Sequence, residues 1–495
     1  MKRRSFITVL VTIGLLVVAG AVLVSAQIGD DNLQFSTSWT FQNLGAGDAH
    51  LDVDFYATDG TLAVTDHVTV SNAASYWAPD YPPLNLGTPF ITFSGGILAI
   101  SDQPVSSIAN QVSINTISEK MGNATYMGIA GDKVAPTVYI PVLMKSFGGK
   151  YWTELNIQNT SASNIQVRVH YYNQDGSEVS GSPLTYPVYA GSPTRVAQAD
   201  ASILPEDWNG SAMVEAVDGT TPIAVVVNEF VGQGTRMYDE FYSYEGFVSG
   251  ATRIVLPAVF VNGYGVDYQA STSVQNLSGP GSPATVTWYF YDTTPGNPNA
   301  ATEILTFTER ITTSKSVYFP VAPYVQTLLD GYEAGDGAWV GAVIMESDEP
   351  LVAIVNELNL PYHAASYVGL SQGDTELYFP LAFVGAYGFA NTSFSIADMS
   401  GDVSTPVTVT VEYLADTEQC PGCSNTEDVY SFYNIDSKYQ PEHLNEELLR
   451  AALSNGTFVG SIKITANKPI NGIMNELMGD FNADNFTSFN AFPAP

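Results

Sequence analysis

The chain is dominated by short stretches in which apolar and polar residues alternate. "LDVDFYATDG", "VRVHYYNQDG", "VTWYFYDTTPG" and "VTVEYLAD" all follow this pattern and run into Asp, Gly or Pro residues. Alternation with a period of two places every second side chain on one face of a β-strand, and Asp, Gly and Pro favour the turns between strands. Helical periodicity is almost absent, except in "PEHLNEELLRAALSNG", which predicts a short helix ended by Gly456. The pattern therefore predicts an all-β protein.

One segment recurs four times along the chain. Each copy has a proline, followed a few residues later by Asn-Gln or Asn-Glu. The prolines are Pro104, Pro222, Pro350 and Pro469, and the pairs begin at Asn110, Asn228, Asn356 and Asn475. The prolines are 118, 128 and 119 residues apart, which is the length of a domain. Asn43, Asn159, Asn276 and Asp398 recur upstream, each just before a polar gap. The sequence is thus a tandem array of one unit.

The second, third and fourth copies each open with a further strand that contains a proline. These residues are Pro141, Pro257 and Pro380. Proline cannot donate a hydrogen bond within a sheet, so we expect an edge strand or a strand that changes sheets at a bulge. About seven short strands in each unit predict an antiparallel two-sheet sandwich of the immunoglobulin-like type, closed around its own apolar interior.

The predicted fold class is all-β, with four tandem immunoglobulin-like antiparallel β-sandwich domains after an N-terminal signal segment. The predicted boundaries are 1–26 for the signal peptide and 27–131, 132–250, 251–373 and 374–495 for the sandwiches. The first sandwich has an atypical start, because no proline strand precedes its Asn43 landmark. Its sheet edge is therefore expected to be unfilled and able to accept a strand from another subunit.

The first residues have the pattern of an export signal. Lys2, Arg3 and Arg4 precede a long apolar run that ends in small residues at Ala26. Cleavage after Ala26 is expected, and the alternative is an uncleaved membrane anchor through residues 6–24. Both alternatives predict an extracellular or cell-surface location.

The chain is strongly acidic, with a formal net charge of −33. Removal of residues 1–26 takes away three basic and no acidic residues, so the mature charge is −33 − 3 = −36. Such a charge repels nucleic acid and anionic lipid, which excludes both as partners.

Gly369-Leu370-Ser371-Gln372-Gly373 matches the G-x-S-x-G pattern of serine hydrolases. A nucleophile of that kind needs a strand, a sharp turn and then a helix, whereas the next residues, "DTELYFPL", predict another strand. Ala130 and Val248 stand at or beside this place in sister copies. We interpret the match as a linker, and no enzymatic activity is predicted.

Other residues with reactive side chains form no enzyme signature. Cys420 and Cys423 are the only cysteines, and outside the cytoplasm we expect them to form a small disulfide clip. The histidines, His50, His67, His170, His363 and His443, do not recur between copies. Acidic clusters at 330–337, at Asp52, Asp54 and Asp59, and at 424–430 leave calcium binding open, and no other cofactor or metal is predicted.

Two further sets of residues are candidates for structure or binding. The recurrent Asn110, Asn228, Asn356 and Asn475 are expected to fix a loop backbone at a strand end. Aromatic residues in corresponding connections, Tyr76, Trp77, Tyr81, Tyr318 and Tyr324, either present rings for sugars and proteins or fill the end of a sandwich.

The unit from the proline strand to "PIAVVVNE" resembles the repeats of secreted bacterial surface proteins built from tandem immunoglobulin-like sandwiches. This resemblance implies an exported structural protein of the cell surface or extracellular matrix, as a rod, an envelope layer or a filament subunit. The alternative is an adhesin or glycan-binding protein that uses aromatic loops. Expected partners are other copies of the chain or cell-surface polymers. The resemblance transfers no catalytic residue.

Overall fold

The computed structural model describes residues 14–17, 33–71, 75–78, 94–115, 121–233, 237–263, 268–292, 303–319, 322, 325, 339–359, 363–386, 390–402, 404–439, 453–478 and 486–494. Most of these residues lie in antiparallel β-strands, which confirms the predicted all-β class. Two 3-10 turns, η2 (Gly131–Lys133) and η3 (Gln198–Asp200), interrupt them. Most of the predicted helix, 440–452, lies outside the described residues. No helix within the described ranges is long and apolar enough to cross a membrane.

The strands are described by the sequence repeat in which they lie. We use repeats 1 to 4 for residues 27–131, 132–250, 251–373 and 374–495. Repeat 1, preceded by β1 (Gly14–Val17), has β2 (Leu33–Asn43), β3 (Ala49–Ala57), β4 (Leu62–Val70), β5 (Ser75–Ala78), β6 (Gly95–Ser101), β7 (Val105–Asn115), β8 (Met121–Met127) and β9 (Ile129–Ala130). Repeat 2 has β10 (Thr137–Lys145), β11 (Tyr151–Asn159), β12 (Ile165–Asn173), β13 (Leu184–Val188), β14 (Pro193–Ala197), β15 (Trp208–Ala216), β16 (Ile223–Gln233) and β17 (Met237–Glu245).

The other two repeats join two of these strands into one long strand. Repeat 3 has β18 (Ala251–Val261), β19 (Gln269–Asn276), β20 (Ala284–Asp292), β21 (Glu303–Ile311), β22 (Ser314–Tyr318), β23 (Trp339–Asn359) and β24 (His363–Val368). Repeat 4 has β25 (Asp374–Val384), β26 (Ala390–Asp398), β27 (Val407–Ala415), β28 (Thr426–Phe432), β29 (Ile435–Tyr439), β30 (Phe458–Met478), β31 (Phe486–Asn490) and β32 (Phe492–Pro493). The 21-residue strands β23 and β30 correspond to β15 plus β16 of repeat 2.

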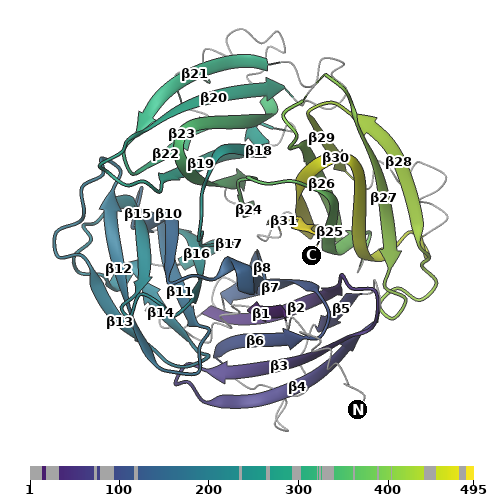
Figure 1. Cartoon of the computed structure of the whole chain (residues 1–495), viewed down its shortest axis with the longest axis horizontal. Helices are drawn as coiled ribbons and strands as arrows, with labels where there is room; N and C mark the ends of the chain where they lie inside the picture. The colour runs from purple at the N-terminus through teal and green to yellow at the C-terminus, as the bar shows by residue number, and fades with distance from the viewer. Residues whose placement is uncertain are drawn as a thin grey trace, which may run out of the picture.

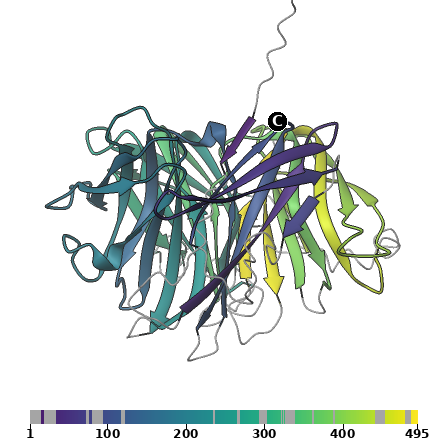
Figure 2. The same ribbon diagram turned by 90° about the horizontal axis from the view of Figure 1, so that it is seen from below.

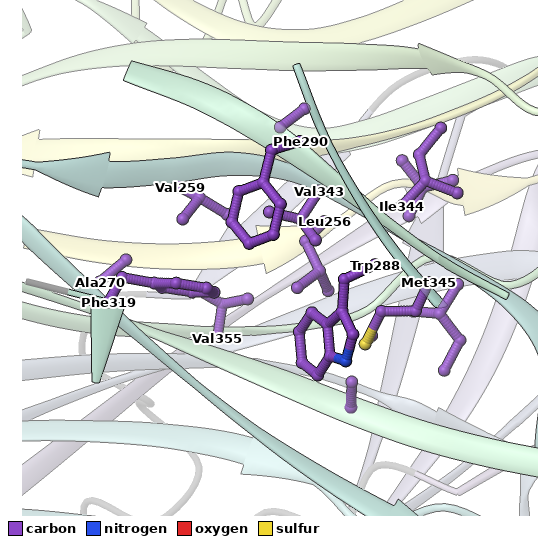
Figure 3. Close-up of a cluster of buried hydrophobic side chains, with 14 of the residues drawn as sticks. Leu256, Val259, Ala270, Trp288, Phe290, Phe319, Val343, Ile344, Met345 and Val355 are labelled. Carbon is purple, nitrogen blue, oxygen red and sulfur yellow. The ribbon is translucent and has the colours of Figure 1, made fainter. Parts of the chain in front are cut away.

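Repeat 2 shows the sheet arrangement most simply. Its outer sheet has the order β10-β15-β12-β13 and its inner sheet the order β14-β11-β16-β17. The apolar core lies between them, with Val138 and Ile140 from the outer sheet and Leu155 and Ile157 from the inner sheet. In repeat 3 the equivalent core includes Trp288 and Phe290 (Figure 3).

The four repeats form a closed ring rather than a rod. Strands β8, β17, β24 and β31, the last inner strands of the repeats, lie nearest the centre (Figure 1). Each of these strands contacts the next, and β31 contacts β8 to close the ring. Seen from the side, the strands run between the two faces of the ring (Figure 2). The expectation of an extended rod is therefore wrong, because repeat 4 returns to pack against repeat 1.

Ring closure depends on one apolar position of each inner sheet. The residue two before each recurrent asparagine is Ile108, Val226, Ile354 or Ile473. Ile354 of repeat 3 is buried in the core cluster of repeat 2, Ile473 of repeat 4 in that of repeat 3, and Ile108 of repeat 1 in that of repeat 4. Val226 packs on Ala109 and Tyr126 of repeat 1, in a small cluster separate from the main core of that repeat.

The sequence led us to expect that each repeat closes its own interior. The structure shows instead that part of each interior is covered by a neighbouring repeat. Alternate residues of a strand point to opposite faces, so one face of each inner sheet lines its own core and the other covers the preceding repeat. We call each contact between neighbouring repeats a seam, numbered 1–2, 2–3, 3–4 and 4–1.

The proline strands contain bulges, as predicted: β10 and β18 lie at sheet edges, and β25 has only the two-residue strand β32 on its other side. In β10 the pairing register shifts between Ile140 and Leu143, so the bulge includes Pro141. The same shift surrounds Pro257 in β18 and Pro380 in β25. The Tyr244 hydroxyl donates to the Val142 carbonyl oxygen at 2.6 Å, and Tyr367 does the same to Ala258 at 2.6 Å. A tyrosine of the last inner strand thus fixes the bulge of the first strand.

Two further sequence landmarks have a geometric cause. A Cβ atom at Gly210 would overlap the Tyr172 carbonyl oxygen, so this position needs glycine. Gly341 and Gly460 lie equally close to a neighbouring carbonyl oxygen. The upstream Asn159 donates to the Ser163 carbonyl oxygen at 2.7 Å and accepts from the Ser161 amide at 2.9 Å. Asn43 and Asn276 make equivalent contacts, so this set of asparagines fixes the loops.

The start of repeat 1 differs from the expected open sheet edge. Strand β1, Gly14–Val17, pairs with β6 and β9 at the place where β10 pairs with β15 in repeat 2. This strand belongs to the predicted signal segment. The edge is filled in the full chain, and the expectation of an unfilled edge in the chain that begins at residue 27 stays a prediction.

We predict that Ile354→Ala lowers the free energy of unfolding by about 2–4 kcal/mol, because it leaves a cavity in the core of repeat 2. Repeats 2 and 3 should still unfold in one transition, since the seam belongs to both. Denaturant titration followed by circular dichroism and tryptophan fluorescence measures this. Val429→Ala, at a position that is 59% exposed, is the control and should change stability little. A loss of stability confined to repeat 3 would contradict the shared core.

Candidate functional site

The structure places Ser371 in a connection between two strands. It is exposed, β24 ends at Val368 before it, and β25 begins at Asp374 after it. The preceding Leu370 pairs with Val255 as an isolated bridge, with amide-to-carbonyl distances of 2.8 and 2.9 Å. This is a strand-to-strand linker and lacks the helix on which a nucleophile elbow is built.

The cysteines and acidic groups also have local partners. Cys420 and Cys423 form a disulfide. Asp52 contacts His67 at 2.7 Å, and Asp54 accepts a hydrogen bond from Thr65. The acidic cluster 330–337 lies outside the described residues. Within the described ranges, no three His, Cys, Asp or Glu side chains come together in a group that could hold a metal ion.

The candidate binding aromatics are only partly described. Tyr76 and Trp77 lie in β5, where their backbones pair with Phe41 and Thr40. Tyr318 ends β22 and its side chain is 45% exposed. Tyr81 and Tyr324 lie outside the described residues. The structure therefore shows one exposed ring from this set.

The recurrent asparagines lie within inner strands and not at loop ends. Each accepts a hydrogen bond from a serine or threonine of the adjacent last strand. The pairs are Thr125 to Asn110 at 2.5 Å, Ser243 to Asn228 at 2.8 Å, Ser366 to Asn356 at 2.6 Å and Ser488 to Asn475 at 2.7 Å. The expected contact with a loop backbone is thus wrong, and the upstream asparagines make that contact instead.

The residue after each asparagine forms the polar part of the seams. Glu229 follows Val225 and Val227 on the core-facing side of β16 and is fully buried. Its carboxylate accepts a hydrogen bond from Asn356 Nδ2 of repeat 3 at 3.0 Å. At seam 3–4, Ser488 donates to the buried Glu357 at 2.9 Å. An asparagine or serine of one repeat thus binds the glutamate of the repeat before it.

Burial raises the pKa of these carboxyls well above the ordinary value. The pKa of Glu229 is raised to about 8 by burial, partly offset by hydrogen bonds from Asn356 and Tyr242. Burial also raises the pKa of Glu357 to about 8, against hydrogen bonds from Ser488 and Asn475. For Glu476 burial alone raises the pKa to about 8. At neutral pH these side chains are therefore mostly protonated and neutral.

A fourth acid, half-buried, lies at seam 1–2. Glu245 of repeat 2 accepts a hydrogen bond from the Met127 amide of repeat 1. Burial raises its pKa to about 7. Seams 1–2, 2–3 and 3–4 therefore include acids that are wholly or partly protonated at neutral pH and that accept hydrogen bonds. Such groups cost little to bury as long as they keep their protons.

Sequence reasoning identified the recurrent Asn-Glu pair but assigned a structural role only to the asparagine. The available signal was the alternation along the strand. Glu229 lies two residues after Val227 and four after Val225, so its side chain faces the core as theirs do. In repeat 1 the same place is Gln111, which has the shape of a protonated glutamate. That substitution also indicates a neutral side chain at this position.

Comparisons with known proteins add little to this geometry. No protein-family model matches the chain, and no curated protein matches it. One solved structure that matches is titled "Crystal Structure of Thermotoga maritima 1070". The match covers 23% of this chain and 93% of that one, with 14% sequence identity and a TM-score of 0.19. At that TM-score the similarity carries no argument about fold or function.

The buried carboxyls predict that stability falls as the pH rises from about 4.5 to about 8. The folded chain holds these protons up to about pH 8, whereas an unfolded glutamate loses its proton near 4.5. Between these values the folded state binds more protons, so raising the pH favours unfolding. These pKa differences correspond to about 5 kcal/mol for each group, so the total loss should be on the order of 10 kcal/mol. Thermal melting across this pH range measures it.

The matched variant replaces Glu229, Glu357 and Glu476 by Gln, the residue that repeat 1 already has. Its melting temperature should change much less between pH 5 and pH 8, conditions that bracket most of the carboxyl titration. Glu303→Gln, at an exposed position of β21, is the control and should keep the wild-type profile. An unchanged pH profile in the triple variant would show that these acids are not neutral in the folded chain.

We predict that Asn356→Ala destabilises the chain by about 2 kcal/mol, because both Ser366 and Glu229 lose a buried hydrogen-bond partner. Asn164→Ala removes an exposed side-chain contact to the Ala190 amide and is the control. Equal unfolding midpoints for the two variants in a denaturant titration would contradict the role of Asn356 at seam 2–3.

Proposed function

We propose that the protein is an exported structural protein of the cell surface or extracellular matrix, built as a compact ring of four β-sandwiches. One observation carries this proposal: the polar positions that recur in the repeats are used for contacts between repeats. Asn356 and Ser488 bind glutamates of the preceding repeat instead of facing an open site. The recurrent polar residues thus join neighbouring repeats, which is what a structural protein requires.

Several features of the chain support export. Three basic residues precede the apolar run that ends at Ala26. The disulfide between Cys420 and Cys423 is stable outside the reducing cytoplasm. The formal charge of −33 favours a soluble surface that does not bind nucleic acid or anionic lipid.

We propose that the four repeats are immunoglobulin-like in the packing of their sheet layers. Two separate antiparallel sheets enclose a core in repeats 1 and 2, and in repeats 3 and 4 the long strands β23 and β30 join the two layers into one connected sheet. This layering supports a similarity to the immunoglobulin class. In repeat 2 the first strand, β10, pairs with the sixth, β15, and the second, β11, pairs with the seventh, β16. An immunoglobulin domain instead keeps its first and second strands in one sheet. The similarity is therefore one of layers and not of strand order.

A second candidate function is binding of sugars or proteins by exposed aromatic rings. Tyr318 supports it, since its ring is 45% exposed at the end of β22. Tyr189 and Tyr433 are exposed to a similar degree, 41% and 53%, in repeats 2 and 4. Aromatic rings that are accessible in this way can stack on sugar rings or form protein contacts.

We predict that the protein on intact producing cells is cleaved by added protease at an exposed C-terminal tag. Without reductant, Cys420 and Cys423 should resist alkylation, as read by mass spectrometry. Retention in the cytoplasm with two alkylated thiols would overturn the proposed location. A glycan array separates the two candidate functions: sugar binding that Tyr318→Ala abolishes would favour the second.

A further inference from the structure

Seam 1–2 is held by hydrogen bonds that cross between repeats. Gln158 Nε2 of repeat 2 donates to the Ile97 carbonyl oxygen of repeat 1 at 3.2 Å. The Met127 amide of repeat 1 donates to the Glu245 carboxylate. Both contacts are additional to the apolar packing of Val226 on repeat 1.

Seams 2–3 and 3–4 have comparable hydrogen bonds. At seam 2–3, Gln275 Nε2 donates to the Ala212 carbonyl oxygen at 3.1 Å, and Asn356 donates to Glu229 at 3.0 Å. At seam 3–4, Ser488 donates to Glu357 at 2.9 Å, and the Asn490 side chain bonds the Val368 amide and carbonyl at 3.1 and 2.7 Å.

Seam 4–1 has the same kinds of residues but not the same bonds. Gln42 corresponds in position to Gln158 and Gln275, and Glu476 corresponds to Glu229 and Glu357. Both side chains are 0% exposed. Among the described residues, neither the amide of Gln42 nor the carboxyl of Glu476 has a hydrogen-bond partner. Apolar packing through Ile108 remains at this seam.

Seam 4–1 is therefore the weakest of the four. Buried polar atoms without partners cost free energy. At the other seams one polar atom of each equivalent side chain is paired, whereas within the described ranges both side-chain polar atoms of Gln42 and of Glu476 are unpaired. In addition, the chain runs directly from one repeat to the next at the other seams, so those neighbours stay tethered when they separate. Among the described residues, the contact shown between repeats 4 and 1 is the apolar packing of Ile108.

We propose that the ring opens at seam 4–1, and that an opened chain binds a second copy of itself through the same two surfaces. The face of repeat 1 that carries Ile108 would then enter the core of repeat 4 of the other copy. The partner is a second copy because these two surfaces are already shown to fit each other in the ring.

The resulting assembly is of the head-to-tail type. Each opened chain presents one Ile108 face and one receiving core, so copies add to one another until a larger ring closes or a fibre grows. Closure within one chain is favoured at low concentration, because the two surfaces are joined by the same chain. Exchange between copies is favoured as the protein concentration rises.

Hydrogen exchange read by mass spectrometry tests the opening. In the purified monomer, the amides of β7, β8 and β31 should exchange faster than those of β16, β17, β23 and β24. On the order of a tenfold difference is expected, which is what one or two missing hydrogen bonds amount to. Equal protection at all four seams would overturn the proposed opening.

Native mass spectrometry and light scattering over a range of concentrations test the association. We expect a monomer at micromolar concentration and whole-number multiples of its mass near millimolar concentration, where exchange between copies competes with ring closure. Ile108→Glu should abolish the multiples, since the charge cannot enter the repeat 4 core of either copy, and Ile108→Val should preserve them. Absence of multiples at every concentration, or their persistence in Ile108→Glu, would overturn the proposal.

A circular permutant tests whether association results from opening at seam 4–1 or from unfolding of the chain. A flexible linker joins residue 494 to residue 14, so that β1 is kept, and the new ends lie between repeats 2 and 3. Seam 4–1 is then tethered, and the permutant should stay monomeric where the natural chain associates. Association equal to that of the natural chain would count against seam 4–1 as the exchange site. These measurements use purified protein, so they are independent of where the cell places it.

Discussion

The architecture depends on the burial of both faces of each inner sheet. Val225 and Val227 face the core of repeat 2, whereas Val226 between them packs on repeat 1. A sandwich that stood alone would expose the second face to water as a continuous apolar surface. In a row of four repeats, contacts between neighbours bury three of these surfaces. The fourth is buried only when repeat 4 packs against repeat 1. The ring therefore follows from the apolar residues of one strand.

The polar residues on these strands determine how the repeats fit together. A buried carboxyl is tolerated because it is protonated and receives hydrogen bonds from the neighbouring repeat, as Glu229 does from Asn356. Apolar packing alone allows small shifts of one sheet over another. Directional bonds at each seam restrict them, and they link the stability of the ring to the protonation of a few groups. Where such bonds are absent, at Gln42 and Glu476, packing has to act alone.

Much of the local structure was predictable from the sequence. Alternation indicated the strands, and the spacing of the recurrent prolines indicated the repeats. Pro141, Pro257 and Pro380 indicated edge strands with bulges, because proline lacks an amide donor. The ring was not predictable in the same way. Ile354 is a normal strand residue in any sandwich, and only its position in three dimensions shows that it completes another repeat. The role of Glu229 was missed for the same reason, since its donor lies 127 residues away.

Closure of the ring also determines the order in which the protein can be completed during synthesis. Repeat 1 leaves the ribosome first, but the surface that covers its Ile108 face is made last. Until repeat 4 has folded, that face remains accessible to other nascent or unfolded chains, a situation that favours aggregation. Contacts between the two ends of a chain also form slowly, because a long loop must close first. Efficient production should therefore depend on chaperones that shield the first repeat while the rest is translated.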